Sequence, residues 1–182
     1  MRYVTSVEQL YSEKWMQHGM VQGLLQGLAA DPANGIERVL DAPRELVFRC
    51  WTEPEHVARW WLPPGFSPAG CEIDLRVGGR FFLAMRSPQG ESFPCEGVYE
   101  EIVPPELLVF QGLGDERHAC GSGLPPRGRV RVHFAGQGAQ TRLTIHARFS
   151  SAQAREAAMA MGFDTSWQGA LEGFAAYLVS LR

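Results

Sequence analysis

The sequence lacks the usual features of membrane, secreted and nucleic-acid-binding proteins. No apolar run approaches the roughly 18 residues that a membrane-spanning helix needs. Glu8, Glu13 and Lys14 interrupt the region where a signal peptide would need a continuous apolar segment. Lysine occurs once and the net charge is −3 at pH 7, so no overall positive field attracts nucleic acid or anionic lipid. We therefore expect a cytoplasmic protein with no membrane span and no nucleic-acid partner.

Closely spaced cysteine pairs and the common short motifs of hydrolases and nucleotide-binding proteins are also missing. Cys50, Cys71, Cys95 and Cys120 lie far apart and form no C-x-x-C pair, which predicts reduced thiols. A chain of 182 residues buries about 70% of its surface on folding, so it can form a core without disulfides or metals. The sequence contains no G-x-S-x-G, H-E-x-x-H, P-loop or G-x-G-x-x-G motif. We assign no catalytic residue, cofactor or metal.

Residues 1–34 differ from the rest of the chain. Ser6 to Gln9 resembles a capping box, and apolar residues follow at helical spacing until the breaker sequence at 31–35. We expect an N-terminal helical extension at 1–34, followed by one domain at 35–182. The apolar face of the extension should pack on that domain or, in a homodimer, on a second copy.

The order of periodic segments in residues 35–182 predicts an α+β fold. A short strand at 36–40 precedes a helix that starts at Pro43 and a second helix that is capped by Thr52 and runs to Trp60–Trp61. Alternating apolar residues then predict strands at 71–77, 81–85, 95–103, 106–112, 128–135 and 140–149. From Trp167 to Leu181 the apolar residues have strong helical spacing. We expect an antiparallel meander with this long helix lying across it.

The Gly78–Gly79 pair marks a hairpin whose register decides which residues face the core. A three-residue loop at 77–79 places Ile73 opposite Leu83, with Leu75 opposite Phe81. Asp74 and Arg76 would then share the outer face of the strand as an exposed ion pair. Under a different register, Arg76 would instead bind an acidic group of a ligand.

Several ordered motifs resemble the heat-shock-protein-90 ATPase activator homologue-like family of the START/SRPBCC (birch-pollen-allergen-like) superfamily. They are APRELVF at 42–48, WTEPEH at 51–56, WWLPPG at 60–65, DLRVGGR at 74–80, Met85, Gly90, GVYEEIVPPELL at 97–108, TRLT at 141–144, and Trp167 with Leu171. The resemblance covers about residues 36–181, with Ser166–Trp167 where the family usually has Gly-Trp. It implies a helix-grip fold, in which a curved antiparallel sheet surrounds the C-terminal helix and leaves a cavity between them. Residues 1–34 lie outside it, and no region resembles the separate chaperone-binding domain of eukaryotic members.

Aromatic residues concentrate in the segments that would surround this cavity, where Gly162, Gly169 and Gly173 would also leave room beside the helix. The candidate lining residues are Trp60, Ile73, Phe81, Leu83, Met85, Phe110, Phe134, Trp167, Leu171 and Phe174. Apolar walls with few polar groups favour a hydrophobic small molecule. We therefore expect a non-catalytic SRPBCC-type protein that binds such a molecule. Plain core packing would use the same residues.

Two other functions stay open. A cyclase or hydrolase of polyketide-like or aromatic substrates would need inward-facing polar groups, for which Asp74, Arg76 and Tyr99 are the candidates. A chaperone-associated protein-binding module would need an exposed apolar patch.

Two polar clusters have simpler interpretations. Asp115, Glu116, His118 and Cys120 include metal-ligating types, but their glycine-rich loop at 112–127 favours a cavity rim over a metal site. His133 and His146 should face outward beside Arg131 and Arg148, either as a solvated surface or as a basic patch for anions. Neither histidine has an evident carboxylate partner for general-base catalysis.

Overall fold

The computed structural model describes residues 35–63, 65–113, 127–160 and 162–182. The expected N-terminal helical extension lies outside these residues and stays a prediction. In chain order, the described elements are β1 (Gly35–Leu40), α3 (Arg44–Thr52), α4 (Pro54–Trp60), β2 (Ser67–Ile73), β3 (Arg80–Arg86), β4 (Ser92–Val103), β5 (Leu107–Gly112), β6 (Arg129–Gln137), β7 (Gln140–Arg148), α5 (Ala152–Ala160) and α6 (Phe163–Ser180).

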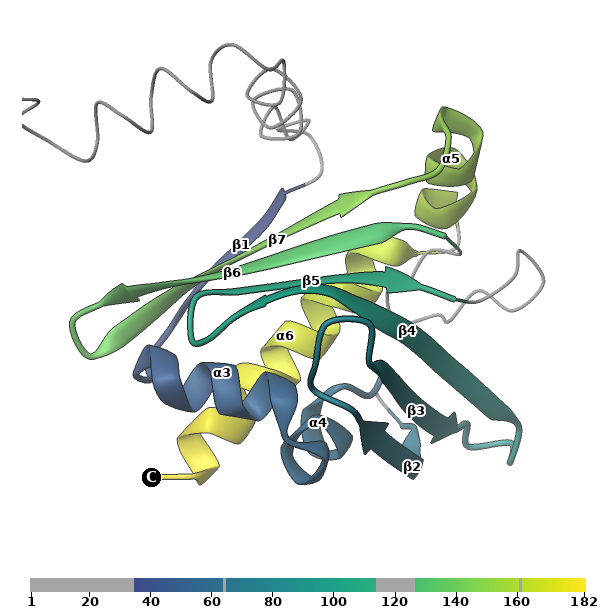
Figure 1. Ribbon diagram of the computed structural model, residues 1–182. Coiled ribbons are helices and arrows are strands. Elements are labelled where there is room, and N and C mark those ends of the chain that lie inside the picture. Colours follow the sequence, from purple (N-terminus) through teal and green to yellow (C-terminus); the bar gives the residue numbers. More distant parts are fainter. Residues whose placement is uncertain (1–34, 64, 114–126, 161) are drawn as a thin grey trace, which may run out of the picture. The chain divides into compact units, whose positions relative to one another are not determined.

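Seven antiparallel strands form one curved sheet in the order β1-β7-β6-β5-β4-β3-β2 (Figure 1). Every strand from β2 to β7 pairs with its sequence neighbour, and β1 closes the other side by pairing with β7. The long helix α6 runs along one face of this sheet, while α3 and α4 lie at one end of it (Figure 1). The predicted α+β helix-grip fold is confirmed.

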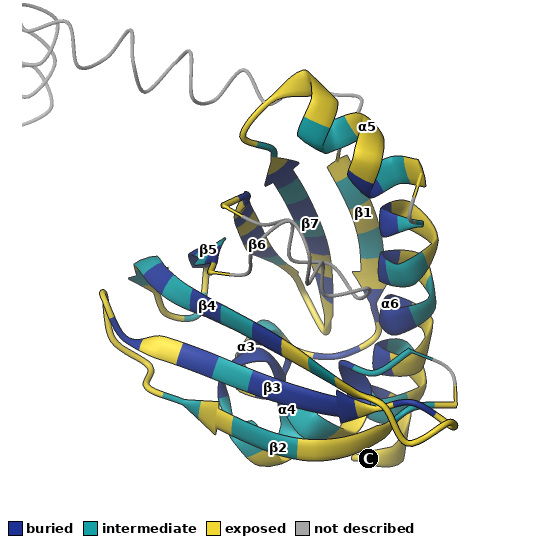
Figure 2. Cartoon of the chain, turned by 90° about the vertical axis from the view of Figure 1, so that its right-hand side faces the viewer, coloured by how far each residue is buried: buried dark blue, intermediate teal, exposed yellow. Residues whose placement is uncertain are grey.

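The strands and α6 bury the faces that they turn toward each other (Figure 2). In β6, Val130, Val132 and Phe134 are buried and alternate with exposed polar residues. In α6, the buried residues follow the predicted helical spacing: Phe163, Trp167, Ala170, Leu171, Phe174 and Leu178. The core therefore lies between the sheet and α6. None of the described helices is long and apolar enough to cross a membrane.

The boundary between α3 and α4 differs from the sequence prediction. Thr52 is the last residue of α3, and its hydroxyl donates to the Phe48 carbonyl oxygen at 3.0 Å, one helical turn back. Glu53 takes the capping position of α4, and Pro54 follows as its first helical residue. The predicted cap at Thr52 is wrong because α3 extends one residue further. Pro43 likewise precedes α3 as its N-cap and is not its first helical residue.

The predicted register of the β2–β3 hairpin is also wrong. Ile73 pairs with Phe81, and Cys71 pairs with Leu83. The connection occupies residues 74–79, where the Gly78 amide donates to the Tyr99 carbonyl oxygen at 2.8 Å and so ties the loop to β4. Gly78 has a φ of +79°, which glycine adopts without steric cost. Leu75 and Val77 therefore lie in this loop, exposed by 42% and 64%, although they continue the apolar alternation of the strand.

Candidate functional site

Trp51 is the centre of an aromatic cluster in the core. Its side chain is 2% exposed, and its ring centroid lies 4.8 Å from that of Trp60. The ring of Trp167, from α6, lies nearly parallel to it at 6.0 Å. Phe134 from β6 and Phe174 from α6 approach Trp51 edge-on. Each such ring buries about 150–250 Å². The cluster therefore fills the space between the sheet and the helices α3, α4 and α6.

A small cavity lies beside this cluster, where α4 approaches strands β2 to β5. Its wall consists of Trp51, Val57, Trp61, Cys71, Ile73, Phe81, Phe82, Leu83, Cys95, Tyr99, Leu108 and Phe110. The cavity volume is about 10 Å³. A single water molecule needs about 10–15 Å³ on this measure. A larger guest therefore requires the surrounding side chains to move apart.

The residues expected to line a ligand cavity occupy two places in the structure. Ile73, Phe81, Leu83 and Phe110 line the cavity beside β2–β5. The others lie in the surrounding core: Trp60, Met85, Phe134, Trp167, Leu171 and Phe174. The space directly between α6 and the sheet is filled by the rings that pack around Trp51. Ligand binding by any of these residues stays a prediction.

The helix glycines do not make room for the cavity. A Cβ at Gly169 would have no atom of another element within 4 Å, and one at Gly173 would only reach the Trp60 carbonyl oxygen at 3.9 Å. Gly162 precedes α6 in a left-handed conformation, with φ of +84°. The residue that makes room is Gly97 of β4, because a Cβ there would overlap the ring of Phe81. The backbone of β4 thereby lets that ring form the cavity wall.

The polar groups in the cavity wall include those of Trp51, Tyr99 and Cys71. The indole Nε1 of Trp51 is buried and has no hydrogen-bond partner among the described residues, whereas that of Trp60 donates to the Cys50 carbonyl oxygen at 2.8 Å. The Tyr99 side chain is 4% exposed, and its hydroxyl makes no hydrogen bond with a described group. Burial raises the pKa of Tyr99 and raises the pKa of Cys71 to about 11. All three groups are neutral at pH 7.

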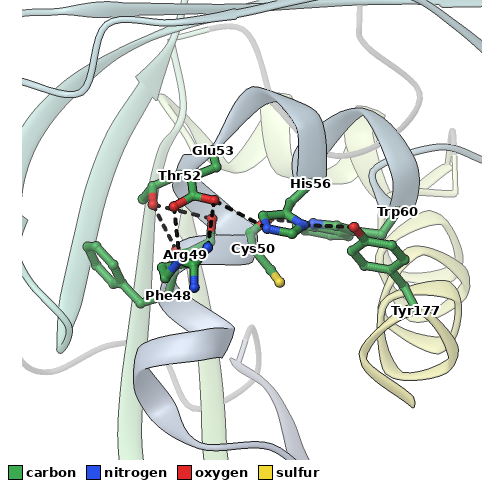
Figure 3. Close-up of polar contacts among 8 residues, drawn as sticks. All are labelled: Phe48, Arg49, Cys50, Thr52, Glu53, His56, Trp60 and Tyr177. Atoms are coloured by element: carbon green, nitrogen blue, oxygen red, sulfur yellow. Dashed lines mark hydrogen bonds and ion pairs between the residues drawn. The ribbon is translucent and has the colours of Figure 1, made fainter. Parts of the chain in front are cut away.

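A chain of polar contacts fastens the short helices to α6 (Figure 3). Arg49 Nε donates to Glu53 Oε1 at 2.9 Å, and Glu53 Oε2 lies 3.2 Å from His56 Nε2. His56 Nδ1 lies 2.7 Å from the hydroxyl of Tyr177 on α6. The hydrogen bond from Arg49 is the main reason that the pKa of Glu53 is lowered. These contacts orient His56 and join α4 to α6, but none of the four residues that make them lines the cavity.

The three polar candidates for an enzymatic site are not brought together. Arg76 Nε donates to Asp74 Oδ2 at 2.8 Å, and both side chains are exposed. This pair was expected on the outer face of a strand, but both residues lie in the loop at 74–79 because β2 ends at Ile73. Tyr99 does line the cavity. A cyclase or hydrolase would therefore have one of its three proposed polar groups there.

The remaining polar clusters provide no further site. His133 is exposed and His146 half-buried, and His146 pairs directly with Arg131 across β6 and β7. Within the described ranges, no three His, Cys, Asp or Glu side chains are close enough to hold a metal ion. The cluster at Asp115, Glu116, His118 and Cys120 lies outside these ranges, so its assignment stays a prediction.

Sequence reasoning missed most of the cavity wall. The missed residues are Trp51, Val57, Trp61, Cys71, Phe82, Cys95 and Leu108, whereas Tyr99 was named only as a polar group for an enzymatic site. One available signal was the alternation of Cys95, Gly97 and Tyr99, which places these three residues on one face of β4. A second was the correct hairpin register, in which Cys71 and Cys95 pair with Leu83 from opposite sides.

Comparisons with known proteins agree with the fold. Residues 41–179 match the family described as Activator of Hsp90 ATPase homolog 1-like protein. A crystal structure from Nitrosomonas europaea is 27% identical, with a TM-score of 0.70 over 80% of this chain and 93% of that chain. A solution structure from Arthrobacter aurescens is 25% identical, with a TM-score of 0.68 over 80% and 85%. The Activator of Hsp90 ATPase homolog 1-like protein of Aeromonas hydrophila is 25% identical, with a TM-score of 0.57 over 81% and 93%.

No curated protein matches the sequence. The family match nevertheless covers most of the residues from β1 to α6. The resemblance noted in the sequence is thus confirmed, and the chain belongs to the family of Activator of Hsp90 ATPase homolog 1-like proteins.

Proposed function

We propose that this protein binds a hydrophobic small molecule, without catalysing a reaction, in the cavity beside β2–β5. The observation that carries this proposal is the composition of the cavity wall, where Trp51, Trp61, Phe81 and Phe110 supply aromatic surface and none of the described lining residues is charged. Ligand sites are mostly apolar with a few convergent polar groups. The fold of this family is commonly associated with hydrophobic ligands, which also supports the proposal.

The guest reaches the cavity at the β2 edge of the sheet. Cys71 and Ile73 line the cavity and are half-buried, so this part of the wall lies close to solvent. In the described part of the chain, β2 pairs with β3 alone. An edge strand can move outward while breaking only one ladder of hydrogen bonds. Outward movement of β2 enlarges the cavity from its resting volume of about 10 Å³.

A pair of leucine variants tests whether binding occurs in this cavity. Leu108 lines it and Leu171 does not, yet both side chains are 1% exposed. Leu108→Ala and Leu171→Ala should each destabilise the fold by about 2–5 kcal/mol, because both leave a space in the core. The two variants are therefore matched in stability cost and differ in where space is created. Leu108→Val and Leu171→Val provide a milder pair for the same comparison.

The measurement is a fluorescence titration with 1-aminoanthracene, an uncharged aromatic probe. We expect saturable binding to the unmodified protein, tighter binding to Leu108→Ala, and little change for Leu171→Ala. The proposal would be contradicted if neither the unmodified protein nor Leu108→Ala bound the probe saturably. Equal tightening by both leucine variants would place the binding site elsewhere in the core.

The other expectations receive less support. Large exposed apolar side chains are distributed over separate elements: Val39 on β1, Leu75 and Val77 in the loop at 74–79, Val103 and Leu113 at strand ends, and Val179 and Leu181 at the end of α6. A chaperone-associated role, a homodimer and a cytoplasmic location all stay predictions.

A further inference from the structure

We propose that the guest of this cavity is an uncharged molecule with a hydrogen-bond acceptor, such as a carbonyl oxygen, which accepts from the indole N–H of Trp51. This inference rests on the proposed function and specifies its ligand class. It combines two observations, a cavity with an apolar wall and a buried donor in that wall that has no acceptor among the described residues.

The unpartnered donor is unusual for this core. Buried polar groups in native proteins nearly always have a hydrogen-bond partner, and those that do not need an explanation. Trp60, which packs against Trp51 and is equally buried, donates to the Cys50 carbonyl oxygen. Trp51 has no such acceptor among the described residues although its side chain borders the cavity. A guest in the cavity can supply the acceptor that these residues do not.

The other wall residues restrict the charge of the guest. Among the described residues, no lysine, arginine or histidine lines the cavity, so a carboxylate would lose its hydration without gaining a cation from them. Tyr99 lines the same cavity, and its hydroxyl is a further neutral donor there. A tyrosine hydroxyl is protonated at pH 7, and burial raises the pKa of Tyr99 further. Neutral donors in an aromatic wall fit ketones, esters and similar uncharged carbonyl compounds.

Two aromatic compounds of nearly the same shape isolate the contribution of the acceptor. Acetophenone carries a carbonyl oxygen where α-methylstyrene carries a methylene group. We expect acetophenone to bind about 2- to 12-fold more tightly, which is the range for one net hydrogen bond between neutral groups. In ¹H–¹⁵N spectra of the unmodified protein, saturation with acetophenone should move the Trp51 indole resonance downfield, whereas α-methylstyrene should not produce this shift.

Two tryptophan variants identify the Trp51 indole resonance and provide a control for the preference for acetophenone. Trp51→Phe removes the unpartnered donor and identifies its resonance, and this variant should lose the preference for acetophenone. Trp60→Phe removes an equally buried indole whose N–H already has an acceptor, so this variant should retain the preference. Because either variant can lose stability, the indole shift in the unmodified protein provides a test that does not depend on their folding.

The outcomes separate the two proposals. Saturable binding of both compounds with equal affinity and without a downfield Trp51 shift would overturn this inference and leave the proposed function standing. Failure of both compounds and of 1-aminoanthracene to bind saturably would overturn the proposed function and, with it, this inference. Tighter binding of acetophenone together with the Trp51 shift would support both.

Discussion

The ring of Phe81 occupies the space in which a side chain at Gly97 would lie. These two residues are direct partners across the β3–β4 ladder, and a Cβ at Gly97 would overlap the Phe81 ring. In this position the ring lies 5.3 Å from the rings of both Tyr99 and Phe110. A missing side chain on β4 thus allows three aromatic rings to meet in the wall of the cavity.

Gly97→Ala should therefore disturb the cavity wall. The new methyl group would displace the Phe81 ring and would also lie 2.8 Å from the Gln111 carbonyl oxygen. Overpacking of this kind costs about 1–3 kcal/mol. Gly70→Ala is the control, because its Cβ would make an ordinary contact with Phe82 at 3.7 Å. Urea unfolding should show a clear loss of stability for Gly97→Ala alone, and equal stability of the two variants would contradict this account.

The hydroxyl of Tyr177 should contribute to stability, whereas that of Tyr99 should not. Tyr177 shares a 2.7 Å hydrogen bond with His56, while the Tyr99 hydroxyl has no partner among the described groups. Tyr177→Phe should lower the free energy of unfolding by about 0.5–1.5 kcal/mol. Tyr99→Phe should change it by less than about 0.5 kcal/mol, since no hydrogen bond is lost. Thermal unfolding of the two variants checks this difference, and the reverse order of stabilities would refute it.

Stability should decrease at alkaline pH. Burial raises the pKa of Cys50 to about 11 and that of Cys71 to about 11, from ordinary values near 9. Between pH 9 and 11 the unfolded chain loses these protons while the folded chain keeps them, so the free energy of unfolding falls as the pH rises. One thiol contributes a slope of at most about 1.4 kcal/mol per pH unit. Denaturant titrations of Cys50→Ala should show a shallower decline than those of the unmodified protein; an unchanged slope would argue against a raised pKa.

Glu53 should add a small stabilisation that is lost in acid. Its pKa is lowered, chiefly by the hydrogen bond from Arg49, so the folded state favours the ionised carboxylate. This contribution is complete above the ordinary carboxyl pKa and disappears as the pH falls through the lowered value. Its size is limited because both side chains are exposed to solvent. Denaturant titrations of Glu53→Gln should show a weaker acid dependence of unfolding than those of the unmodified protein, and an unchanged dependence would contradict this contribution.

Strong periodic patterns in the sequence predicted most of the fold. The alternation at 128–135 and 140–149 matches β6 and β7, and the spacing from Trp167 onward matches the buried face of α6. The predicted register of the β2–β3 hairpin is wrong because Leu75 and Val77 continue the apolar alternation although they do not pair with β3. Backbone hydrogen bonds from the loop at 74–79 to β4 determine its conformation, and residue patterns contain no direct record of such contacts.

The cavity was harder to predict for a different reason. The sequence identified the aromatic residues that surround the interior but not which of them pack solidly. Trp167 and Phe174 fill the space beside α6 by contacting Trp51, and the remaining gap lies closer to β2. The location of a small gap depends on ring orientations and on local features such as Gly97. The unpartnered indole N–H of Trp51 likewise becomes visible only when its surroundings are known.

The most direct test of the central claim is isotope-filtered nuclear Overhauser spectroscopy on labelled protein saturated with unlabelled acetophenone. If the guest occupies the cavity beside β2–β5, its protons should give contacts to the rings of Trp61, Phe81 and Phe110, which line that cavity. Contacts restricted to exposed side chains, such as Val179 at the end of α6, would contradict the claim that this protein holds a hydrophobic molecule inside its core.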